Sequence, residues 1–248
     1  MLEDSTLRPQ NLVPIDLPKA AEACPGVVIG PCSPDDWVEG LNLLYQRLSS
    51  ASRSATIVEL LRQEARGALD LSGLWVAFRK RRMVGAMLTQ LLAGRAAAIW
   101  PPVVARSWRS SPLAPAMVRQ AVQWYQNRGA LLAQALVDRG MPPQASVDLE
   151  RGGLPFVTDL IYLSRSTAED LCLSPDLPPL EWEGFTLERR DCFSRTLERS
   201  YEGSLDMPEL GGLRRLEDVL QSHLVRGAFD PDRWRLGRIQ GQSEPVAL

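Results

Sequence analysis

A short motif recurs in this chain at a distance of 160 residues, and it constrains the fold more than any other feature. Residues 66–70 read RGALD and residues 226–230 read RGAFD. The surroundings also match, because each copy follows a strand pattern and two helix patterns and precedes another strand pattern. Such self-similarity indicates two related domains. A chain of 248 residues is long enough for one large or two modest domains.

The domain limits follow from this recurrence. We expect an irregular arm at 1–25, a first domain at 26–165, a linker at 166–183 and a second domain at 184–248. The linker is rich in Pro, Ser and acidic residues, which disfavour regular structure. The first copy contains a full set of elements, whereas the second ends at PVAL, in a predicted strand. We therefore expect a complete first domain and a truncated second domain with one open sheet edge, through which the chain could self-associate.

The hydrophobic periodicity predicts alternating strands and helices in both copies. Ser33 is expected to cap the first helix, and the basic run Arg79-Lys80-Arg81-Arg82 is expected to be a solvated hairpin tip. In the first copy the predicted strands are 26–31, 74–78, 83–92, 96–104, 130–137 (buried) and 156–165, with helices from Ser33, from about Ser54, along 113–127 and at 145–151. In the second copy the predicted strands are 185–188, 233–239 and 245–248, with two helices between the first and second of them.

Composition excludes several classes of function. The formal net charge is −2, so there is no global basic field for non-specific nucleic-acid binding. No apolar run approaches the roughly 20 residues of a membrane span, and the N-terminus lacks the order of a signal peptide. Four scattered cysteines and one histidine predict no metal site. These features favour a cytoplasmic protein with reduced cysteines and with neither nucleic-acid nor membrane partners.

Three segments resemble parts of one known family. The first is Arg109-Ser110-Ser111-Pro112-Leu113-Ala114 between a predicted strand and a long helix, the second is Gly153-Leu154-Pro155-Phe156, and the third is Tyr201–Arg214. Together with the order of elements from Gly26 onward, they resemble the GCN5-related N-acetyltransferase (GNAT) family. The two-copy arrangement is most similar to its tandem members, which have the architecture of mycothiol synthase.

The resemblance implies a fold, a reaction and a set of site residues. The implied fold is α+β, with a mixed, mostly antiparallel sheet flanked by helices. The implied reaction is transfer of an acetyl group from acetyl-CoA to the amine of a small molecule, a protein N-terminus or a lysine. The implied acetyl-CoA site comprises Arg106, Arg109, Ser110, Ser111, Leu113 and Ala114.

The chemistry of the loop leaves two interpretations open. A helix N-terminus binds phosphate through unpaired N–H groups and a partial positive charge. Pro112 stands where the family has its central glycine, and Pro115 follows in the same turn, so two N–H donors are missing. Arg106 and Arg109 could replace them with charge-assisted bonds. The alternative is that Ser110 or Ser111 caps a core helix, the cofactor site has decayed, and the domain is a non-catalytic scaffold or ligand-binding module.

The sequence identifies no catalytic base or acid. General acid–base catalysis of acetyl transfer needs a group that deprotonates the amine and one that stabilises the leaving thiolate. The resemblance implies a Glu on the strand before the loop and a Tyr on the helix after the next strand, but the predicted strand 96–104 contains no acidic residue and the helix 145–151 contains no tyrosine. Asp148 and Glu150 on that helix are expected on a solvated face.

A polar segment near the end of the chain is the candidate acceptor site. By the resemblance, the segment YEGSLDMPEL corresponds to one wall of the acceptor groove. The candidate contacts for a cationic or polar substrate are Tyr201, Ser204, Asp206 and Glu209. The alternative is a turn-rich connector, because turn chemistry alone explains the Gly, Ser and Asp content. We expect His223 on the next helix to serve in packing.

Overall fold

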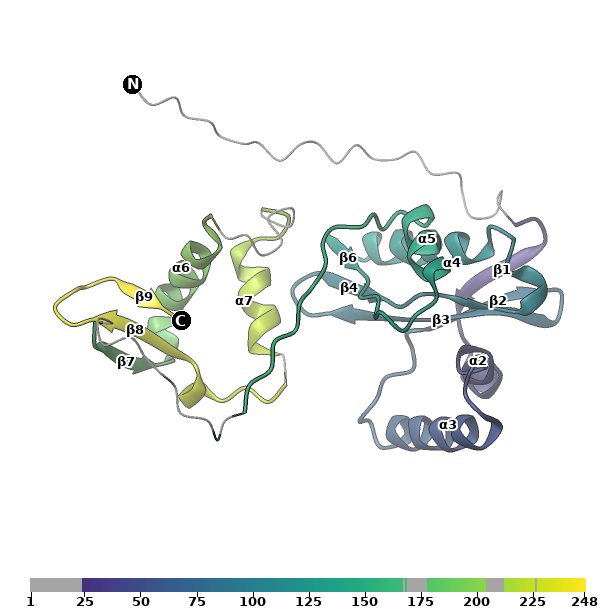
Figure 1. Cartoon of the computed structure of the whole chain (residues 1–248), viewed down its shortest axis with the longest axis horizontal. Coiled ribbons are helices and arrows are strands. Elements are labelled where there is room, and N and C mark those ends of the chain that lie inside the picture. The colour runs from purple at the N-terminus through teal and green to yellow at the C-terminus, as the bar shows by residue number, and fades with distance from the viewer. Residues whose placement is uncertain (1–23, 167, 169–177, 204–211, 226) are drawn as a thin grey trace, which may run out of the picture. The chain divides into compact units, whose positions relative to one another are not determined.

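The computed structural model describes residues 24–166, 168, 178–203, 212–225 and 227–248 (Figure 1). The chain divides into two compact units, Met1–Phe156 and Val157–Leu248, and each is described by itself. Nearly all of the predicted N-terminal arm and much of the predicted linker lie outside the described residues. The end of the predicted linker is a strand, Leu180–Gly184, whereas the strand predicted at 185–188 is wrong because Leu187–Arg189 form a 3-10 turn. No helix in the described ranges is long and apolar enough to cross a membrane.

The first unit is built on one mixed sheet with strand order β1-β2-β3-β4-β6, and β5 pairs with β3. All neighbours are antiparallel except β4 and β6, which are parallel. This confirms the predicted α+β class with a mostly antiparallel sheet flanked by helices. The strands are β1 (Val27–Pro31), β2 (Leu74–Arg79), β3 (Arg82–Leu92), β4 (Ala96–Ile99), β5 (Val103–Val104) and β6 (Leu132–Gln134).

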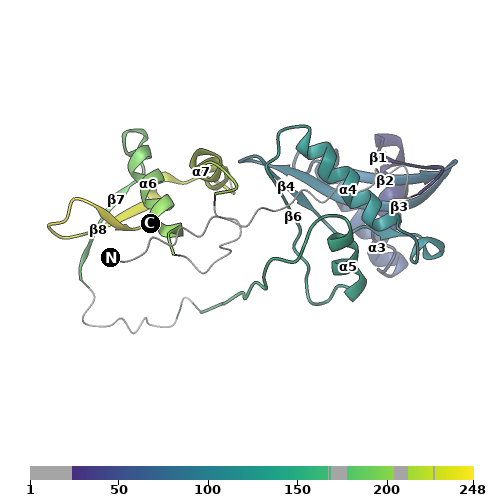
Figure 2. The same ribbon diagram turned by 90° about the horizontal axis from the view of Figure 1, so that it is seen from above.

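Helices cover both faces of this sheet (Figures 1 and 2). In Figure 1, α2 and α3 lie below the sheet, and α4 and α5 lie above it. A 3-10 turn, η1 (Pro34–Asp36), precedes α2, and a second one, η2 (Arg106–Trp108), precedes α4. The helices are α2 (Trp37–Leu44), α3 (Ser50–Ala65), α4 (Leu113–Gln126) and α5 (Pro143–Arg151).

Two hydrophobic clusters fill the space between the layers. Successive strand residues point to opposite faces, and β2 contributes to both clusters in this way. Trp75 and Ala77 belong to the cluster under α4, whereas Leu74 and Val76 belong to the cluster that includes α2 and α3. The continuous apolar run of this strand is therefore explained by burial on both faces.

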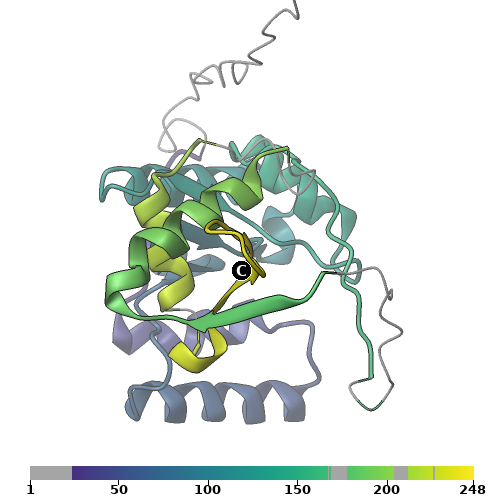
Figure 3. The ribbon, with the colours of Figure 1, turned by 90° about the vertical axis from the view of Figure 1, so that its left-hand side faces the viewer.

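The second unit has a smaller antiparallel sheet with the order β7-β8-β9. The strands are β7 (Leu180–Gly184), β8 (Arg235–Ile239) and β9 (Pro245–Ala247) (Figures 1 and 3). The helices are α6 (Arg190–Tyr201) and α7 (Leu216–Leu224), and two 3-10 turns, η3 (Leu187–Arg189) and η5 (Pro231–Arg233), precede α6 and β8. An aromatic cluster forms its core, with Phe185 in edge contact with Phe193, Phe229 and Trp234. The order strand, two helices and two strands is the same as in β1 to β3.

The hairpin between β2 and β3 and the end of α3 form as predicted. The hairpin turn consists of Lys80 and Arg81, and Lys80 adopts a φ of +56°, as primed two-residue turns require. Helix α3 stops before Gly67, whose φ is +69°. Glycine takes this conformation without steric cost, which explains the break.

Two predicted strands in the first unit are shorter than expected. The strand predicted at 96–104 is interrupted between Ile99 and Val103, since Pro101 and Pro102 provide no N–H for a ladder. The strand predicted at 130–137 is reduced to β6, and it is half-exposed rather than buried because it pairs on one side only, with β4. The predicted cap by Ser33 is wrong, since its side chain makes no capping hydrogen bond.

The predicted strand Phe156–Arg165 is wrong. No strand is assigned there, and Ile161 and Leu163 are 82% and 92% exposed. The local sequence favours a strand, but a strand also needs a neighbouring edge, and no described residue provides one. The residues of 156–165 do not indicate whether a partner strand lies beside them in the fold.

Candidate functional site

The parallel strands β4 and β6 separate at their C-terminal ends. They pair over three residues, from Ala96 opposite Leu132 to Ala98 opposite Gln134. After β4 the chain continues as β5, which pairs with β3, and Val104 of β5 lies opposite Gly85. In the described ranges, β5 does not pair with the residues that follow β6. The resulting wedge between strands leaves a free backbone edge. An extended ligand with amide groups can bind such an edge in the manner of an added strand.

The backbone of Val104 faces this free edge. The Ala105 N–H donates to the Val84 carbonyl at 2.9 Å. Bonded and non-bonded positions alternate in an antiparallel pair, so the neighbouring Val104 directs its N–H and C=O away from β3. Gln46 Nε2 donates to the Val104 carbonyl oxygen at 3.3 Å, which agrees with this direction. The Val104 N–H is therefore directed toward the wedge.

The loop between β5 and α4 is held by a serine. Ser111 Oγ donates to the Trp108 carbonyl at 2.6 Å and accepts from the Leu113 N–H at 3.3 Å. The predicted alternative of a serine that ties down the helix start is thus found in part, with Ser111 in that role. The same bond uses one of the N–H groups that a phosphate would need.

The start of α4 offers few backbone donors. Pro112 precedes the helix and Pro115 lies in its first turn, and neither has an N–H. The Leu113 N–H is occupied by Ser111, and the Ala116 N–H donates to the Pro112 carbonyl at 3.0 Å. In the first turn, only the Ala114 N–H has no acceptor among the described residues. An ordinary helix N-terminus presents about four such groups.

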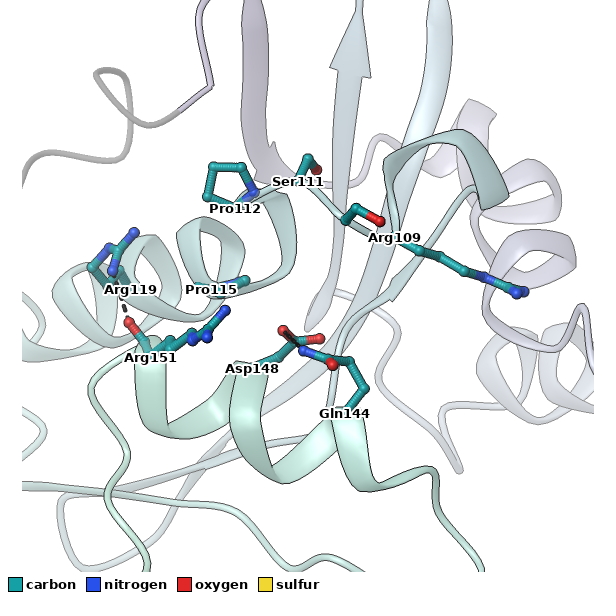
Figure 4. Close-up of a pocket in the computed structure, with 9 residues that line it drawn as sticks. Arg109, Ser111, Pro112, Pro115, Arg119, Gln144, Asp148 and Arg151 are labelled. Atoms are coloured by element: carbon teal, nitrogen blue, oxygen red, sulfur yellow. Dashed lines mark hydrogen bonds between the residues drawn. The ribbon is translucent and has the colours of Figure 1, made fainter.

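A polar cavity of about 620 Å³ adjoins this helix start (Figure 4). It lies between the loop, the first turns of α4, and α5. Three arginines and one aspartate are among its lining residues, so the lining is positive overall. The lining residues are Arg109, Ser110, Ser111, Pro112, Pro115, Arg119, Gln144, Asp148 and Arg151.

One hydrogen bond joins the two helices beside this cavity, since Arg119 Nη1 on α4 donates to the Arg151 carbonyl at the end of α5 at 2.8 Å. Within α5, Gln144 Nε2 donates to Asp148 Oδ1 at 2.9 Å. The Arg119 Nε atom is buried without a hydrogen-bond partner among the described residues. A buried donor without a partner lowers the stability of the fold. Figure 4 shows the Arg109 side chain extending away from Arg119 and Asp148.

The structure places the predicted acetyl-CoA residues in three different ways. Arg109, Ser110 and Ser111 line the cavity. Leu113 and Ala114 are buried, so they could contribute only backbone groups. Arg106 is exposed on η2 and does not line the cavity.

Sequence reasoning missed several of the cavity residues. Arg119, Gln144 and Arg151 were not predicted, and Asp148 was expected on a solvated face. The signal in the sequence is weak, because these positions on two helices converge only through the contact of α4 with α5.

The predicted acceptor residues are described only in part. Tyr201 is half-exposed at the end of α6, and its hydroxyl lies 3.3 Å from His223 Nε2. The His223 ring is also in edge contact with Trp234 at a centroid distance of 6.4 Å, which agrees with the packing role expected for it. The other three candidates, Ser204, Asp206 and Glu209, lie outside the described residues.

Titratable groups with shifted pKa values do not form a catalytic pair in the first unit. Burial raises the pKa of the Cys24 thiol, and the nearby Arg119 opposes this rise. Burial also raises the pKa of Tyr125, whose hydroxyl lies 2.7 Å from Thr89 Oγ1. Both groups are held in their neutral forms inside the core. Among the described residues, no group of His, Cys, Asp and Glu is arranged to hold a metal ion.

Three acetyltransferase structures illustrate what the chain is similar to. An aminoglycoside acetyltransferase from an uncultured soil metagenomic sample has 16% identity and a TM-score of 0.41, over 58% of this chain and 97% of that chain. A ribosomal-protein-alanine N-acetyltransferase from Brucella melitensis biovar Abortus 2308 has 17% identity and a TM-score of 0.44, over 56% and 99%. A GNAT family acetyltransferase from Brucella melitensis in complex with acetyl-CoA has 17% identity and a TM-score of 0.36, over 46% and 77%. No protein-family model and no curated protein matches the sequence.

Proposed function

We propose that the first unit is a GNAT-type N-acetyltransferase domain that takes the acetyl thioester of acetyl-CoA and transfers the acetyl group to an amine. The observation that carries the proposal is the wedge between β5 and β6, which opens beside the start of α4 and its arginine-lined cavity. An extended pantetheine arm could bind the free strand edge while the phosphates of the cofactor lie near the arginines. The proposal includes a cytoplasmic location and a second unit that is a related copy.

In the proposed reaction, the backbone of Val104 would stabilise the transition state of acetyl transfer. The amine nitrogen attacks the thioester carbonyl carbon, an N–C bond forms, and the C–S bond breaks to release the thiol. Negative charge develops on the carbonyl oxygen in the transition state, and the Val104 N–H would stabilise it. Gln46 binds the carbonyl of the same residue and thereby holds the peptide plane in position.

The phosphates of the cofactor would be bound mainly by side chains. The start of α4 supplies one free N–H, from Ala114, so Arg119 and Arg151 would carry most of the attraction through charge-assisted bonds. Arg109 would contribute only after its side chain turns toward the cavity. Acetyl-CoA binding is therefore expected to be weak. We propose an amine of a small molecule, a protein N-terminus or a lysine as acceptor. Tyr201, Ser204, Asp206 and Glu209 remain the proposed acceptor contacts of the groove that belongs to the second copy itself.

Calorimetry and an acetyl-transfer assay test this function. Acetyl-CoA should bind the whole chain, and Arg151→Ala should weaken binding roughly tenfold or more, which is the expected effect of losing one charge-assisted contact. Arg139→Ala is the matched control, because Arg139 is exposed and does not line the cavity. Absence of both binding and transfer at millimolar acetyl-CoA would contradict the proposal.

A second candidate function follows from the same loop. Two prolines and an occupied Leu113 N–H leave the phosphate site poor in donors, which favours a GNAT-like domain that has lost catalysis and serves as a scaffold or ligand-binding module. Binding of acetyl-CoA with no transfer to any amine in a broad panel would support this second function over the first. The proposal of self-association through the sheet edge of the second unit is tested separately, by the molar mass in solution.

A further inference from the structure

A continuous set of cations lies at the end of the sheet where the β5–α4 loop begins. We call this set the basic rim. All of its members are exposed, and four of them are consecutive in the β2–β3 hairpin. The basic rim comprises Arg79, Lys80, Arg81, Arg82, Arg106 and Arg109.

Backbone and side-chain contacts hold the two parts of the basic rim together. Arg79 and Arg82 face each other across the hairpin. The loop is tied to the same end of β3 by the bond from the Ala105 N–H to the Val84 carbonyl. The Arg79 guanidinium lies over the Trp108 ring at 5.4 Å from its centroid. The hairpin cations therefore lie beside η2, which directly precedes the cavity-lining Arg109 in the chain.

The basic rim has no internal compensation. In the described part of the first unit, no carboxylate lies within ion-pair distance of its six cations. The first unit, Met1–Phe156, contains 17 Lys and Arg but 13 Asp and Glu, which gives a charge of +4, whereas the whole chain carries −2. The positive charge is thus concentrated in the unit that holds the cavity. Such a surface attracts acidic macromolecules.

We propose that the acyl group is delivered by an acidic carrier protein that bears a phosphopantetheine arm and docks on the basic rim. This inference rests on the proposed acyl transfer and names its donor. The arm would enter the wedge between β5 and β6 while the acidic surface of the carrier contacts the hairpin. The amine attacks the thioester carbon, the C–S bond breaks, the thiol remains on the carrier, and the proton of the amine goes to the thiolate.

The number of phosphate donors favours this source over free CoA. A carrier-bound arm has one phosphodiester, whereas CoA has a pyrophosphate and a further phosphate on its ribose. The start of α4 offers one free N–H, from Ala114, because Pro112 and Pro115 have none and Ser111 occupies the next. A site poor in backbone donors fits a singly charged group better than a polyphosphate, and the remaining affinity would come from the protein surface.

The composition of the rim disfavours a nucleic-acid partner. Proteins that bind single strands combine basic residues with aromatic side chains on which bases stack. The aromatic ring at the rim is that of Trp108, which is half-buried and already covered by Arg79. The basic rim thus offers positive charge but no exposed aromatic ring on which a base could stack. Charge of this kind is sufficient for electrostatic complementarity with an acidic protein surface.

Fluorescence anisotropy with a labelled acyl carrier protein tests the proposal on the whole chain. The apo carrier, its holo form and its acetylated form are titrated separately at 50 and 300 mM NaCl, and acetyl-CoA is titrated by calorimetry in parallel. We expect the holo carrier to bind, the apo carrier to retain much of that affinity, and both to weaken at high salt. The double variant Arg81→Glu/Arg82→Glu should weaken carrier binding at least tenfold. It should weaken acetyl-CoA binding much less, because neither residue lines the cavity.

The control is Arg47→Glu/Arg66→Glu, which changes the net charge equally at two exposed positions outside the basic rim. An equal loss with the control variant would overturn the proposal, because it would show a non-specific charge effect. Absence of carrier binding, or tighter binding of a labelled 30-nucleotide single strand, would also overturn it. If acetyl-CoA binds and is used while no carrier binds, the proposed function stands and the carrier inference alone fails. If neither donor binds, both fail.

Discussion

Gly152 is the position at which one methyl group should test the packing of α4 on α5. It follows α5, with φ −80° and ψ −6°, so its backbone conformation accepts alanine. A Cβ atom placed there would lie 2.5 Å from both Cβ and Cγ1 of Val118 and 3.0 Å from the Asp148 carbonyl oxygen. Any cost of Gly152→Ala would therefore come from steric overlap between the two helices.

The size of that cost follows from the distances. Carbon atoms in contact are separated by about 3.5–4.0 Å, so the helices would have to move apart by roughly 1 Å. Overpacking of this kind costs about 1–3 kcal/mol. Replacing glycine by alanine also lowers the conformational entropy of the unfolded chain, which stabilises the fold by about 0.4–1 kcal/mol. We expect a net destabilisation of about 1–2 kcal/mol and a weaker bond from Arg119 to the Arg151 carbonyl beside the cavity.

Hydrogen exchange of the peptides that cover β2 and β3, measured in increasing urea, reports the free energy of unfolding of the first unit alone. Gly140→Ala is the matched control, because Gly140 has no atom within 4 Å of the added Cβ and its φ is not in the left-handed region. Val118→Ala removes one of the two overlapping atoms. The free energy of unfolding lost in the double variant Gly152→Ala/Val118→Ala should therefore be smaller, by about 0.5 kcal/mol or more, than the sum of the losses in the two single variants. Strict additivity, or wild-type stability of Gly152→Ala, would refute the predicted overlap.

Three further predictions concern buried and exposed groups. Burial and two neighbouring carboxylates raise the pKa of the Cys32 thiol to about 12, from 9.0. The neutral thiol stabilises the folded state fully below pH 9, and this stabilisation is lost as the pH rises toward 12. In urea titrations the free energy of unfolding should therefore fall, relative to that of Cys32→Ala, by up to about 1.4 kcal/mol per pH unit in this range. Thr89→Val leaves the Tyr125 hydroxyl without its 2.7 Å partner and should cost about 1–3 kcal/mol, with a smaller additional cost when Tyr125→Phe is added. Ile161→Lys/Leu163→Lys should change stability by at most about 0.5 kcal/mol, because both side chains are more than four-fifths exposed, and a larger loss would indicate a pairing partner.

The sheet and its covering helices could be predicted because their signals are local. The apolar residues of α4 recur at the helical period, and the hairpin ends where a basic turn interrupts two apolar runs. The strand predicted at 156–165 had an equally good local pattern and is absent. The difference between the two cases lies in the neighbours, because β3 has partners on both sides whereas 156–165 has none among the described strands.

The site was predictable to the extent that it is contiguous in sequence. Arg109, Ser110 and Ser111 belong to one loop, and all three line the cavity. Arg119 and Arg151 reach the same cavity from two helices whose approach depends on the absence of a side chain at Gly152. That contact depends on three-dimensional packing, so no pattern within either helix could have indicated it.

The prolines of the loop and the cations of the hairpin are best understood together. Pro112 and Pro115 remove the N–H groups that would bind a polyphosphate, which taken alone favours loss of function. The neighbouring hairpin places Arg81 and Arg82 at the same end of the sheet without carboxylate partners in the described part of the first unit. Uncompensated surface charge destabilises the folded chain by self-repulsion, so a partner that neutralises it would contribute binding energy. In the proposed carrier complex, the few backbone donors at the start of α4 and the many cations on the hairpin would shift recognition from the phosphates of the donor to the protein that carries it.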